Sequence, residues 1–289
     1  MFFKDAAEPE DPIQGALGDC WLIAALSAVT WAIPKWYFQR PARISSHELK
    51  TTPSDIGINS EIPFWDKPAG RTAPSGMVDI SNKLCVYPGT SILIYCRSSD
   101  SGELWPAIWE KAFAKWSTKD ASDFPDMGSL AGGDPIAACA QLTNRNPVHY
   151  SNQAQTADQI YNIVNMNCTG QKTFNPMTAW TYWVPEPKQP NYDFYYFTNI
   201  AANHAYTIMG CFTDSGKKFI VLRNPWGWFE PPPERPGLNT PRFINPFEGT
   251  VRFLDSTYWR PIQMLNPDGI FALEVSDFKK YYGGFGVAV

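Results

Sequence analysis

Proline is the feature of this sequence that most restricts its fold. The 289 residues contain 26 prolines, about twice the usual share of roughly 5%. Because a proline inside a helix removes a hydrogen bond and clashes with the preceding turn, long helices cannot dominate such a chain. Aromatic residues make up 15% of the chain, which excludes a largely disordered protein. The length allows one large domain or two modest ones.

Charge and cysteine content exclude several classes of protein. The net charge is −4 and no cluster of Lys and Arg is present, so we expect no nucleic-acid partner. Six cysteines form no C-x-x-C pair and only three histidines occur, which argues against a structural zinc site. The cysteine spacing is also irregular for a disulfide scaffold. We therefore expect a reducing, cytoplasmic setting.

An uncharged run from Cys20 to Pro34 is the longest apolar stretch of the chain. It is shorter than the roughly 20 apolar residues that a membrane span needs, and it contains Ser27 and Thr30. The run has no internal Gly or Pro, so it predicts a buried helix that Pro34 ends. We expect no membrane span, and the acidic residues before Pro12 do not resemble a signal peptide.

The remaining patterns predict a mixed fold in two parts. Helical spacing covers residues 104–116 and 136–143, whereas short strands are predicted within residues 53–88. Strands are also predicted at 178–185, 191–200, 204–212 and 218–224, and residues 267–287 are predicted as strand, turn, strand. We therefore predict an α+β fold with a helical part, 1–144, and a β-rich part, 145–289. The join is expected near Thr143 to Asn146, and the active cleft between the parts.

Three residues could form a catalytic group. Cys20 follows a Gly-rich turn at the start of the predicted helix, where free amides and the helix dipole favour a thiolate. His204 could act as its base, and the side-chain oxygen of Asn224 could orient the imidazole. The Gln14 amide could donate to an oxyanion. Three of these residues also have a structural interpretation, as a buried thiol, a strand histidine and an Asn-Pro turn, and Gln14 alone indicates nothing.

The sequence around these residues resembles the calpains, which are calcium-regulated, papain-like cysteine proteases. The segment QGALGDCWLIAALSAV is similar to their nucleophile segment, NHAYTIMG to their histidine segment and LRNPWG to their asparagine segment. Three further blocks match in order: ELWPAIWEKAFAKW, LAGGDPIAACAQLT and DGIFALEVSDFKKYY. The resemblance extends from about Asp11 to the last residue.

The resemblance implies a role for each matching residue. Cys20 would be the nucleophile, His204 the general acid and base, and Asn224 the residue that orients the histidine. Gln14 and the Cys20 backbone amide would form the oxyanion hole.

Two tryptophans are expected at the substrate cleft. Trp226 matches the tryptophan that shields the His–Asn contact in calpains and that separates the two lobes until calcium aligns them. Trp21 belongs to the nucleophile segment.

Calpain protease cores bind two calcium ions, so the resemblance implies calcium as a cofactor. Asp11 and Glu103 match the acidic ligands of the first site. Glu230 and Asp268 match ligands of the second site, but Ile270 stands where the family has a glutamate. Because an aliphatic side chain cannot ligate calcium, we expect the first site to be retained and the second to be degraded. No organic cofactor is expected.

We therefore predict a papain-like, two-lobed cysteine endopeptidase that makes limited cuts in intracellular proteins. Protein substrates are its expected partners. Only the protease core is recognisable, so the chain is either a core-only protein or a fragment whose partners include further calpain-type domains. A catalytically silent interaction module on the same scaffold is the alternative. Transglutaminase-like acyl transfer is a third interpretation, but such enzymes generally use Asp where Asn224 stands.

Overall fold

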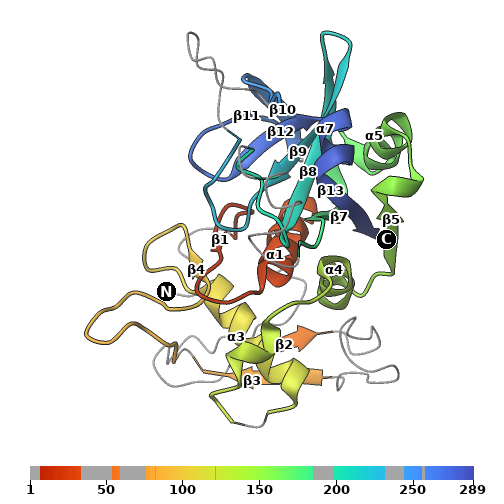
Figure 1. Cartoon of the computed structure of the whole chain (residues 1–289). Coiled ribbons are helices and arrows are strands. Elements are labelled where there is room, and N and C mark those ends of the chain that lie inside the picture. Colours follow the sequence, from red (N-terminus) through yellow and green to blue (C-terminus); the bar gives the residue numbers. More distant parts are fainter. Residues whose placement is uncertain are drawn as a thin grey trace.

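The computed structural model describes residues 7–33, 54–58, 76–81, 83–120, 122–184, 195, 198–231, 244–255 and 258–289, with only the backbone given for 54–58, 76–79 and 258. Within these ranges α-helices accompany a seven-stranded sheet (Figure 1). The fold is therefore α+β, as the sequence predicts.

The predicted helices are present. Helix α1 spans Cys20–Ala32 and is buried on every side from its second residue onward. Helix α3 spans Trp105–Thr118 and ends where Lys119 adopts a left-handed conformation. A short 3₁₀ helix, η1 (Met127–Leu130), precedes α4 (Pro135–Thr143). Helix α4 begins sharply because the Asp134 carboxylate accepts hydrogen bonds from the Ile136 and Ala137 amides. Its first position is occupied by Pro135, which suits the first turn of a helix because no backbone donor is needed there.

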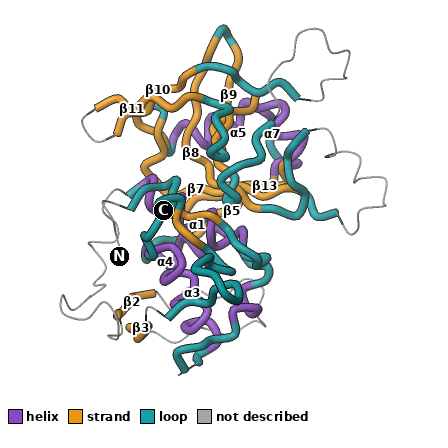
Figure 2. The backbone as a smooth tube through the Cα atoms, turned by 90° about the vertical axis from the view of Figure 1, so that its left-hand side faces the viewer, coloured by secondary structure: helices purple, strands orange, loops and turns teal. Residues whose placement is uncertain are grey.

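Helix α1 occupies the centre of the molecule. It lies between the sheet and helices α3 and α4 in both views (Figures 1 and 2). The Trp31 indole donates to the Met209 carbonyl at 2.6 Å, and the Thr207 hydroxyl donates to the Ala24 carbonyl at 2.7 Å. Because both faces of α1 are covered, its continuously apolar sequence is explained by burial rather than by amphipathic spacing.

The main sheet has the strand order β12-β9-β8-β7-β13-β5, with β6 paired to β7, and each of these pairs is antiparallel. The strands are β5 (Pro147–Ser151), β6 (Cys168–Thr169), β7 (Lys172–Thr181), β8 (Ala205–Asp214), β9 (Lys217–Arg223), β12 (Ile270–Glu274) and β13 (Tyr282–Ala288). Strands β8 and β9 confirm the predictions for 204–212 and 218–224. The predicted strand 191–200 lies mostly outside the described residues.

Three small strand pairs complete the described chain. They are β1 (Pro12–Ile13) with β4 (Arg97–Ser98), β2 (Ser54–Ile58) with β3 (Gly76–Ile80), and β10 (Thr250–Asp255) with β11 (Tyr258–Gln263). A single 3₁₀ turn, η2 (Asn152–Ala154), follows β5. Strands β2 and β3 agree with the short strands predicted for 53–88, of which other parts are not described.

Two helices in the second half correct the predictions. The stretch predicted as a turn within 267–287 is helix α7 (Val275–Tyr281), because Val275, Phe278 and Tyr281 recur on one helical face and are buried. Helix α5 (Ala157–Met166) was not predicted, although Thr156 and Gln159 form a complete capping box at its start. The second half is therefore less purely β than its composition indicates.

The buried apolar side chains form three clusters. One surrounds α1, α3 and α4. The other two lie on opposite faces of the main sheet, one under α5 and α7 and one under β10 and β11. Helix α4 ends at Thr143 and β5 begins at Pro147, so the predicted join lies between a helix and a strand of the main sheet. In the part of the chain that is described, no helix has the length and apolar character needed to cross a bilayer.

Candidate active site

The hairpin of β8 and β9 brings His204 and Asn224 together. His204 directly precedes β8 and Asn224 directly follows β9. The two strands are antiparallel neighbours, with Thr207 opposite Arg223, so residues twenty positions apart meet at one end of the hairpin. The Thr181 side chain fixes the His204 backbone, because its hydroxyl accepts the His204 amide at 3.0 Å.

The His204 imidazole is bound to the Asn224 side chain. His204 Nε2 lies 2.9 Å from Asn224 Oδ1, and the same oxygen accepts the Trp226 amide at 3.1 Å. Because a backbone amide can only donate, this second bond identifies the Asn224 atom as the carbonyl oxygen. His204 Nε2 must therefore carry the hydrogen, which leaves Nδ1 with a free electron pair.

Trp226 covers this pair. Its ring centroid lies 4.5 Å from that of His204, with the planes inclined by 42°. The turn that carries it is closed by a hydrogen bond from the Gly227 amide to the Asn224 carbonyl. Gly269 packs so tightly there that a Cβ atom would come 2.8 Å from the Asn224 carbonyl oxygen. The sequence placed Trp226 at the cleft, and in the structure it contacts His204.

Cys20 and His204 line the same cavity. Cys20 is the first residue of α1, and its sulfur faces the backbone amide of Ala205, the residue after His204. The cavity has a volume of about 350 Å³. Its lining comes from the start of α1, the loop before α4, the end of β7 and the start of β8: Gly18, Cys20, Trp21, Gly132, Gly133, Asp134, Pro135, His149, Trp180, Thr181, Trp183, Asn203, His204 and Ala205.

Burial keeps both reactive groups neutral. It raises the pKa of the Cys20 thiol to about 11, against the opposing effect of the Ala205, Trp21 and Cys20 amides, and the charge of Asp19 raises it further. Burial also lowers the pKa of His204 to about 4, although the hydrogen bond to Asn224 favours the charged ring. At neutral pH the resting pair is therefore a thiol beside a neutral imidazole.

Gln14 and Trp21 lie on either side of the start of α1. The Gln14 side-chain amide donates to the Leu17 carbonyl at 2.6 Å, and its backbone amide donates to the Pro225 carbonyl at 2.9 Å. Its backbone is thus held to the asparagine turn, whereas its side chain is bound to Leu17 and does not line the cavity. Trp21 does line it, and its indole donates to the Leu130 carbonyl at 2.8 Å. A Cβ on Gly133 would lie 2.4 Å from the Trp21 ring.

The first pair of predicted calcium ligands is brought together. Asp11 and Glu103 are 4% and 2% exposed, and the charge of Glu103 acts on Asp11. Asp11 accepts the Glu8 amide at 2.7 Å and the Trp105 indole at 3.1 Å, while Glu103 accepts the Ser98 hydroxyl at 2.8 Å. Burial, together with Glu103, raises the pKa of Asp11 to about 7.

The second pair also meets. A Glu230 carboxylate oxygen accepts the Gly269 amide, and Asp268 accepts the Ile270 amide at 2.9 Å. Burial first, and then the charge of Glu230, raises the pKa of Asp268 to about 6. Ile270 begins β12 with its side chain buried, so it adds no ligand. Among the described residues no group of three acidic, cysteine or histidine side chains forms a metal site.

Sequence reasoning missed two polar features, one in the cavity wall and one directly before Asn224. His149 Nε2 lies 2.7 Å from Asp134 Oδ2, and both residues line the cavity. The Arg223 guanidinium is buried and binds the Glu10 and Pro12 carbonyls and the Ser27 hydroxyl. The position of Arg223 directly before Asn224 was a usable signal. His149 and Asp134 are fifteen residues apart, and no local pattern joins them.

Comparison with known proteins gives a consistent result. The sequence pattern of the family described as "Calpain family cysteine protease" matches residues 1–232. A protein named "Thiol protease" from Porphyromonas gingivalis is 28% identical over 93% of this chain and 53% of its own length. "Calpain" from Schistosoma mansoni is 28% identical over 78% of this chain and 27% of its own. "Calpain-8" from Mus musculus is 24% identical over 98% of this chain and 36% of its own. The chain therefore spans about half, or less, of the length of these curated relatives.

Proposed function

Because the chain belongs to the calpain family of cysteine proteases, we propose that it is an endopeptidase whose catalytic residues are Cys20, His204 and Asn224. The observation that carries this proposal is the bond of 2.9 Å between His204 Nε2 and Asn224 Oδ1. It leaves His204 Nδ1 as a free base in a cavity that Cys20 also lines. A nucleophile, a base and a residue that orients the base are the components of covalent acyl transfer.

In the proposed reaction the Cys20 sulfur attacks the carbonyl carbon of a peptide bond. The thiol proton moves to His204 Nδ1 as the carbon–sulfur bond forms, and it then passes to the leaving amine as the peptide bond breaks. Water next attacks the thioester, gives one proton to His204, and releases the acid and the thiol. Since both resting groups are neutral, the thiol proton must be transferred during attack or upon prior rearrangement of the site.

The oxyanion that forms during attack lies near the start of α1. The Cys20 backbone amide is one proposed donor, because it belongs to the free amides of a helix N-terminus. Gln14 is the second proposed donor. Its amide now binds the Leu17 carbonyl, so this role requires the Gln14 side chain to turn away from Leu17 toward the cavity.

The proposal includes a papain-like arrangement of two lobes, 1–144 and 145–289. It is supported by the separate core around α1, α3 and α4 and by the cores on the sheet. The cavity draws its lining from both parts. Protein substrates follow from the proposed activity, and a cytoplasmic, reducing setting is proposed because Cys20 must remain a thiol to act as a nucleophile.

Calcium binding at Asp11 and Glu103 is part of the proposal. The residues suit a cation, because Asp11 and Glu103 are both buried and the pKa of Asp11 is raised first by burial and then by the charge of Glu103. Calcium takes six to eight oxygen ligands, so backbone carbonyls or water must supply the rest. The ion would neutralise this pair and stabilise the contact between residues near β1 and the start of α3. Glu230 and Asp268 offer the same arrangement with Ile270 at the third position, which predicts weaker binding.

A peptide-cleavage assay tests the proposal. A fluorogenic peptide should be hydrolysed by the wild type and not by Cys20→Ala, with Cys85→Ser as the matched control because Cys85 is an exposed thiol outside the cavity. Equal turnover by wild type and Cys20→Ala would overturn the assignment of the nucleophile. No labelling of Cys20 by a thiol-reactive activity probe, with calcium present, would favour the silent interaction module instead.

A further inference from the structure

A histidine and an aspartate form a pair in the wall of the cavity that Cys20 and His204 also line. His149 lies in β5, and Asp134 is the N-cap residue of α4. His149 Nε2 lies 2.7 Å from Asp134 Oδ2. The Asp134 side chain is only 7% exposed, whereas that of His149 is 43% exposed. The imidazole is therefore the member of the pair that a bound peptide can reach.

The charge of Asp134 is compensated from two directions. Its Oδ1 atom accepts the Ile136 amide at 2.8 Å and the Ala137 amide at 3.2 Å. The free amides and the dipole at a helix N-terminus favour a negative charge. Its other oxygen, Oδ2, faces His149. The negative end of the pair is thus buried and compensated, and the end that faces the cavity is the imidazole.

The His149 ring keeps one nitrogen for a ligand. Within the described chain, Nδ1 forms no hydrogen bond. A protonated imidazole carries a hydrogen on both nitrogens, so Nδ1 can donate while Nε2 stays bound to Asp134. The Trp180 ring lies beside His149, with the two centroids 6.0 Å apart, and Trp183 is 75% exposed. Both tryptophans line the cavity and can pack against the methylene groups of a bound side chain.

The other polar side chains of the cavity wall are already engaged. The Thr181 hydroxyl accepts the His204 amide, and the Asn203 side chain binds the amide and the carbonyl of Val184. The described residues that line the cavity include no Lys and no Arg. His149 is therefore the group that can offer a positively charged donor there.

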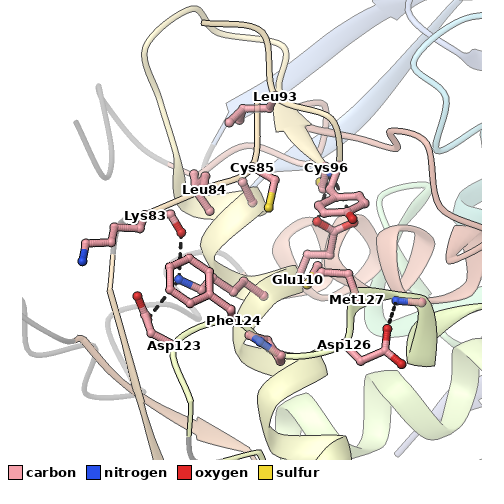
Figure 3. Close-up of a pocket in the computed structure, with 15 residues that line it drawn as sticks. Lys83, Leu84, Cys85, Leu93, Cys96, Glu110, Asp123, Phe124, Asp126 and Met127 are labelled. Carbon is pink, nitrogen blue, oxygen red and sulfur yellow. Dashed lines mark hydrogen bonds and ion pairs between the residues drawn. The ribbon is translucent and has the colours of Figure 1, made fainter. Parts of the chain in front are cut away.

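A second cavity shows the contrast. It has a volume of about 230 Å³ and shares no lining residue with the first. Figure 3 shows its charged side chains bound within the protein, since Lys111 Nζ lies 3.0 Å from Asp123 Oδ1. The Glu110 carboxyl there faces the Cys96 amide at 3.2 and 3.0 Å. These three side chains are already paired, whereas His149 has a donor to spare.

We propose that His149 is a specificity-determining residue, positioned by Asp134, that favours peptide substrates with a glutamate or aspartate close to the cleaved bond. This inference rests on the proposed protease function and deepens it by naming a substrate class. The protonated ring donates Nδ1–H to the substrate carboxylate. A hydrogen bond between two charged groups is stronger than one between neutral groups, so the cavity distinguishes glutamate from glutamine of the same shape.

The charges around His149 set the direction of the pH effect. The hydrogen bond to Asp134 raises the pKa of His149 above its usual value, against the effect of burial, and the charge of Asp134 adds to the rise. On the neighbouring strand β13, Gly286 lies opposite His149. In the same cavity Cys20 and His204 are neutral at neutral pH. A substrate glutamate stays ionised above about pH 4.3. The preference is therefore present at mildly acid pH and is lost as the pH rises through the pKa of His149.

Three variants separate charge from shape. His149→Gln removes the positive charge but can still donate to Asp134. His149→Lys keeps a positive charge to higher pH. Asp134→Asn can still cap α4 but removes the charge that raises the pKa of His149. Lys217→Gln is the matched control, because it removes one positive charge from the exposed surface of β9, outside the cavity.

The experiment compares kcat/KM for pairs of fluorogenic peptides that differ only by Glu or Gln at one position near the cleaved bond, between pH 5.5 and 9. Because both peptides use the same Cys20 and His204, the ratio of their kcat/KM values cancels the titration of those two groups. At one position the wild type and Lys217→Gln should favour Glu by about fivefold at pH 6 and not at pH 9.

The variants should change this ratio in different ways. His149→Gln should show no preference at either pH, and His149→Lys should keep the preference at pH 9. Asp134→Asn should lose the preference about one pH unit below the wild type. This shift of the pH profile is the readout of the positioning role, because a purely structural defect would lower kcat/KM for both peptides equally.

The proposal is overturned if no position shows a preference for Glu over Gln at pH 6, or if His149→Gln keeps the wild-type preference. A preference for Lys over Gln would also overturn it, because Asp134 would then set the charge of the site. Should Asp134→Asn not fold, the two His149 variants still decide. Fluorescence anisotropy with Cys20→Ala measures binding of the same peptides. Tighter binding of the Glu peptide at pH 6, without cleavage by the wild type, would support the acidic specificity and refute the protease activity.

Discussion

The two sides of the candidate active-site cavity hold the proposed catalytic residues by different means. On the sheet side, His204 and Asn224 are fixed by the antiparallel register of β8 and β9 and by hydrogen bonds to Thr181 and the Trp226 amide. On the helical side, Cys20 is the first residue of α1, and the residue before it, Asp19, has a buried carboxyl group.

This difference indicates where regulation can act. The backbone hydrogen bonds between β8 and β9 hardly respond to pH or to cations, because they join neutral amide groups. Buried carboxyl groups do respond, since each changes charge or gains a counter-ion at modest energetic cost. We therefore expect the strand register to supply constant geometry, and the sensitivity to pH and calcium to come from buried carboxyl groups such as those of Asp11 and Asp268.

The largest expected effect tests the sheet side. His204→Ala should lower kcat/KM by about 10³-fold or more, because it removes the proposed general base. Asn224→Ala should lower it by about 10²-fold, since the ring remains but its orientation is lost. Steady-state kinetics on the same peptide measures both. If Asn224→Ala were as active as the wild type, the hydrogen bond to His204 would have no catalytic role.

A smaller effect compares the two acidic pairs. Glu103→Gln should raise the calcium concentration needed for half-maximal activity by about tenfold, because calcium affinity depends on the number of charged ligands. Glu230→Gln should raise it by less, as that pair already has Ile270 at the third position. Calcium-titrated cleavage with a chelator control gives both values. Full activity in excess chelator would refute calcium dependence altogether.

The smallest effect concerns stability and has opposite signs for His204 and Asp11. The pKa of His204 is lowered from 6.5 to about 4 in the folded state. The stability that this shift contributes is therefore fully present above pH 6.5 and is lost as the pH falls toward 4. The pKa of Asp11 is raised from 3.8 to about 7 in the folded state. The stability that this shift contributes is therefore fully present below pH 3.8 and is lost as the pH rises through 7.

Urea unfolding in chelator checks this contrast. Relative to Asp11→Asn, the wild type should lose about 2 kcal/mol of unfolding free energy between pH 4 and 7.5. Relative to His204→Gln, the wild type should instead gain a similar amount of unfolding free energy over that interval. Parallel curves for all three proteins would show that neither group titrates abnormally in the folded state.

Local patterns predicted the elements but not all of their contacts. The apolar run after Cys20 gave α1, and Pro106 and the helical spacing around it gave α3. The hairpin that joins His204 to Asn224 could be predicted because β8 and β9 are adjacent in the chain. Helix α7 was missed because its seven residues lie between two strands. The apolar pattern of so short a helix cannot be told from that of a turn.

The remaining contacts depend on tertiary structure. Asp19 and Glu110 are far apart in the sequence, and each resembles an ordinary polar residue of a helix terminus or face. Only the packing of α1 against α3 buries both side chains. The same is true of Asp134 and His149 at the cavity, which meet because α4 packs beside β5 and β13.

Labelling of Cys20 by a peptide-based electrophile tests the central claim most directly, because it requires both a bound peptide and an activated sulfur. The proteins to compare, at saturating calcium, are the wild type and His204→Ala, and intact mass together with peptide mapping locates the adduct. We expect one adduct per chain, on Cys20, in the wild type and a rate at least about 10²-fold lower in His204→Ala. Equal rates in the two proteins, or an adduct on one of the other cysteines, would contradict the assignment of Cys20 and His204 as a catalytic pair.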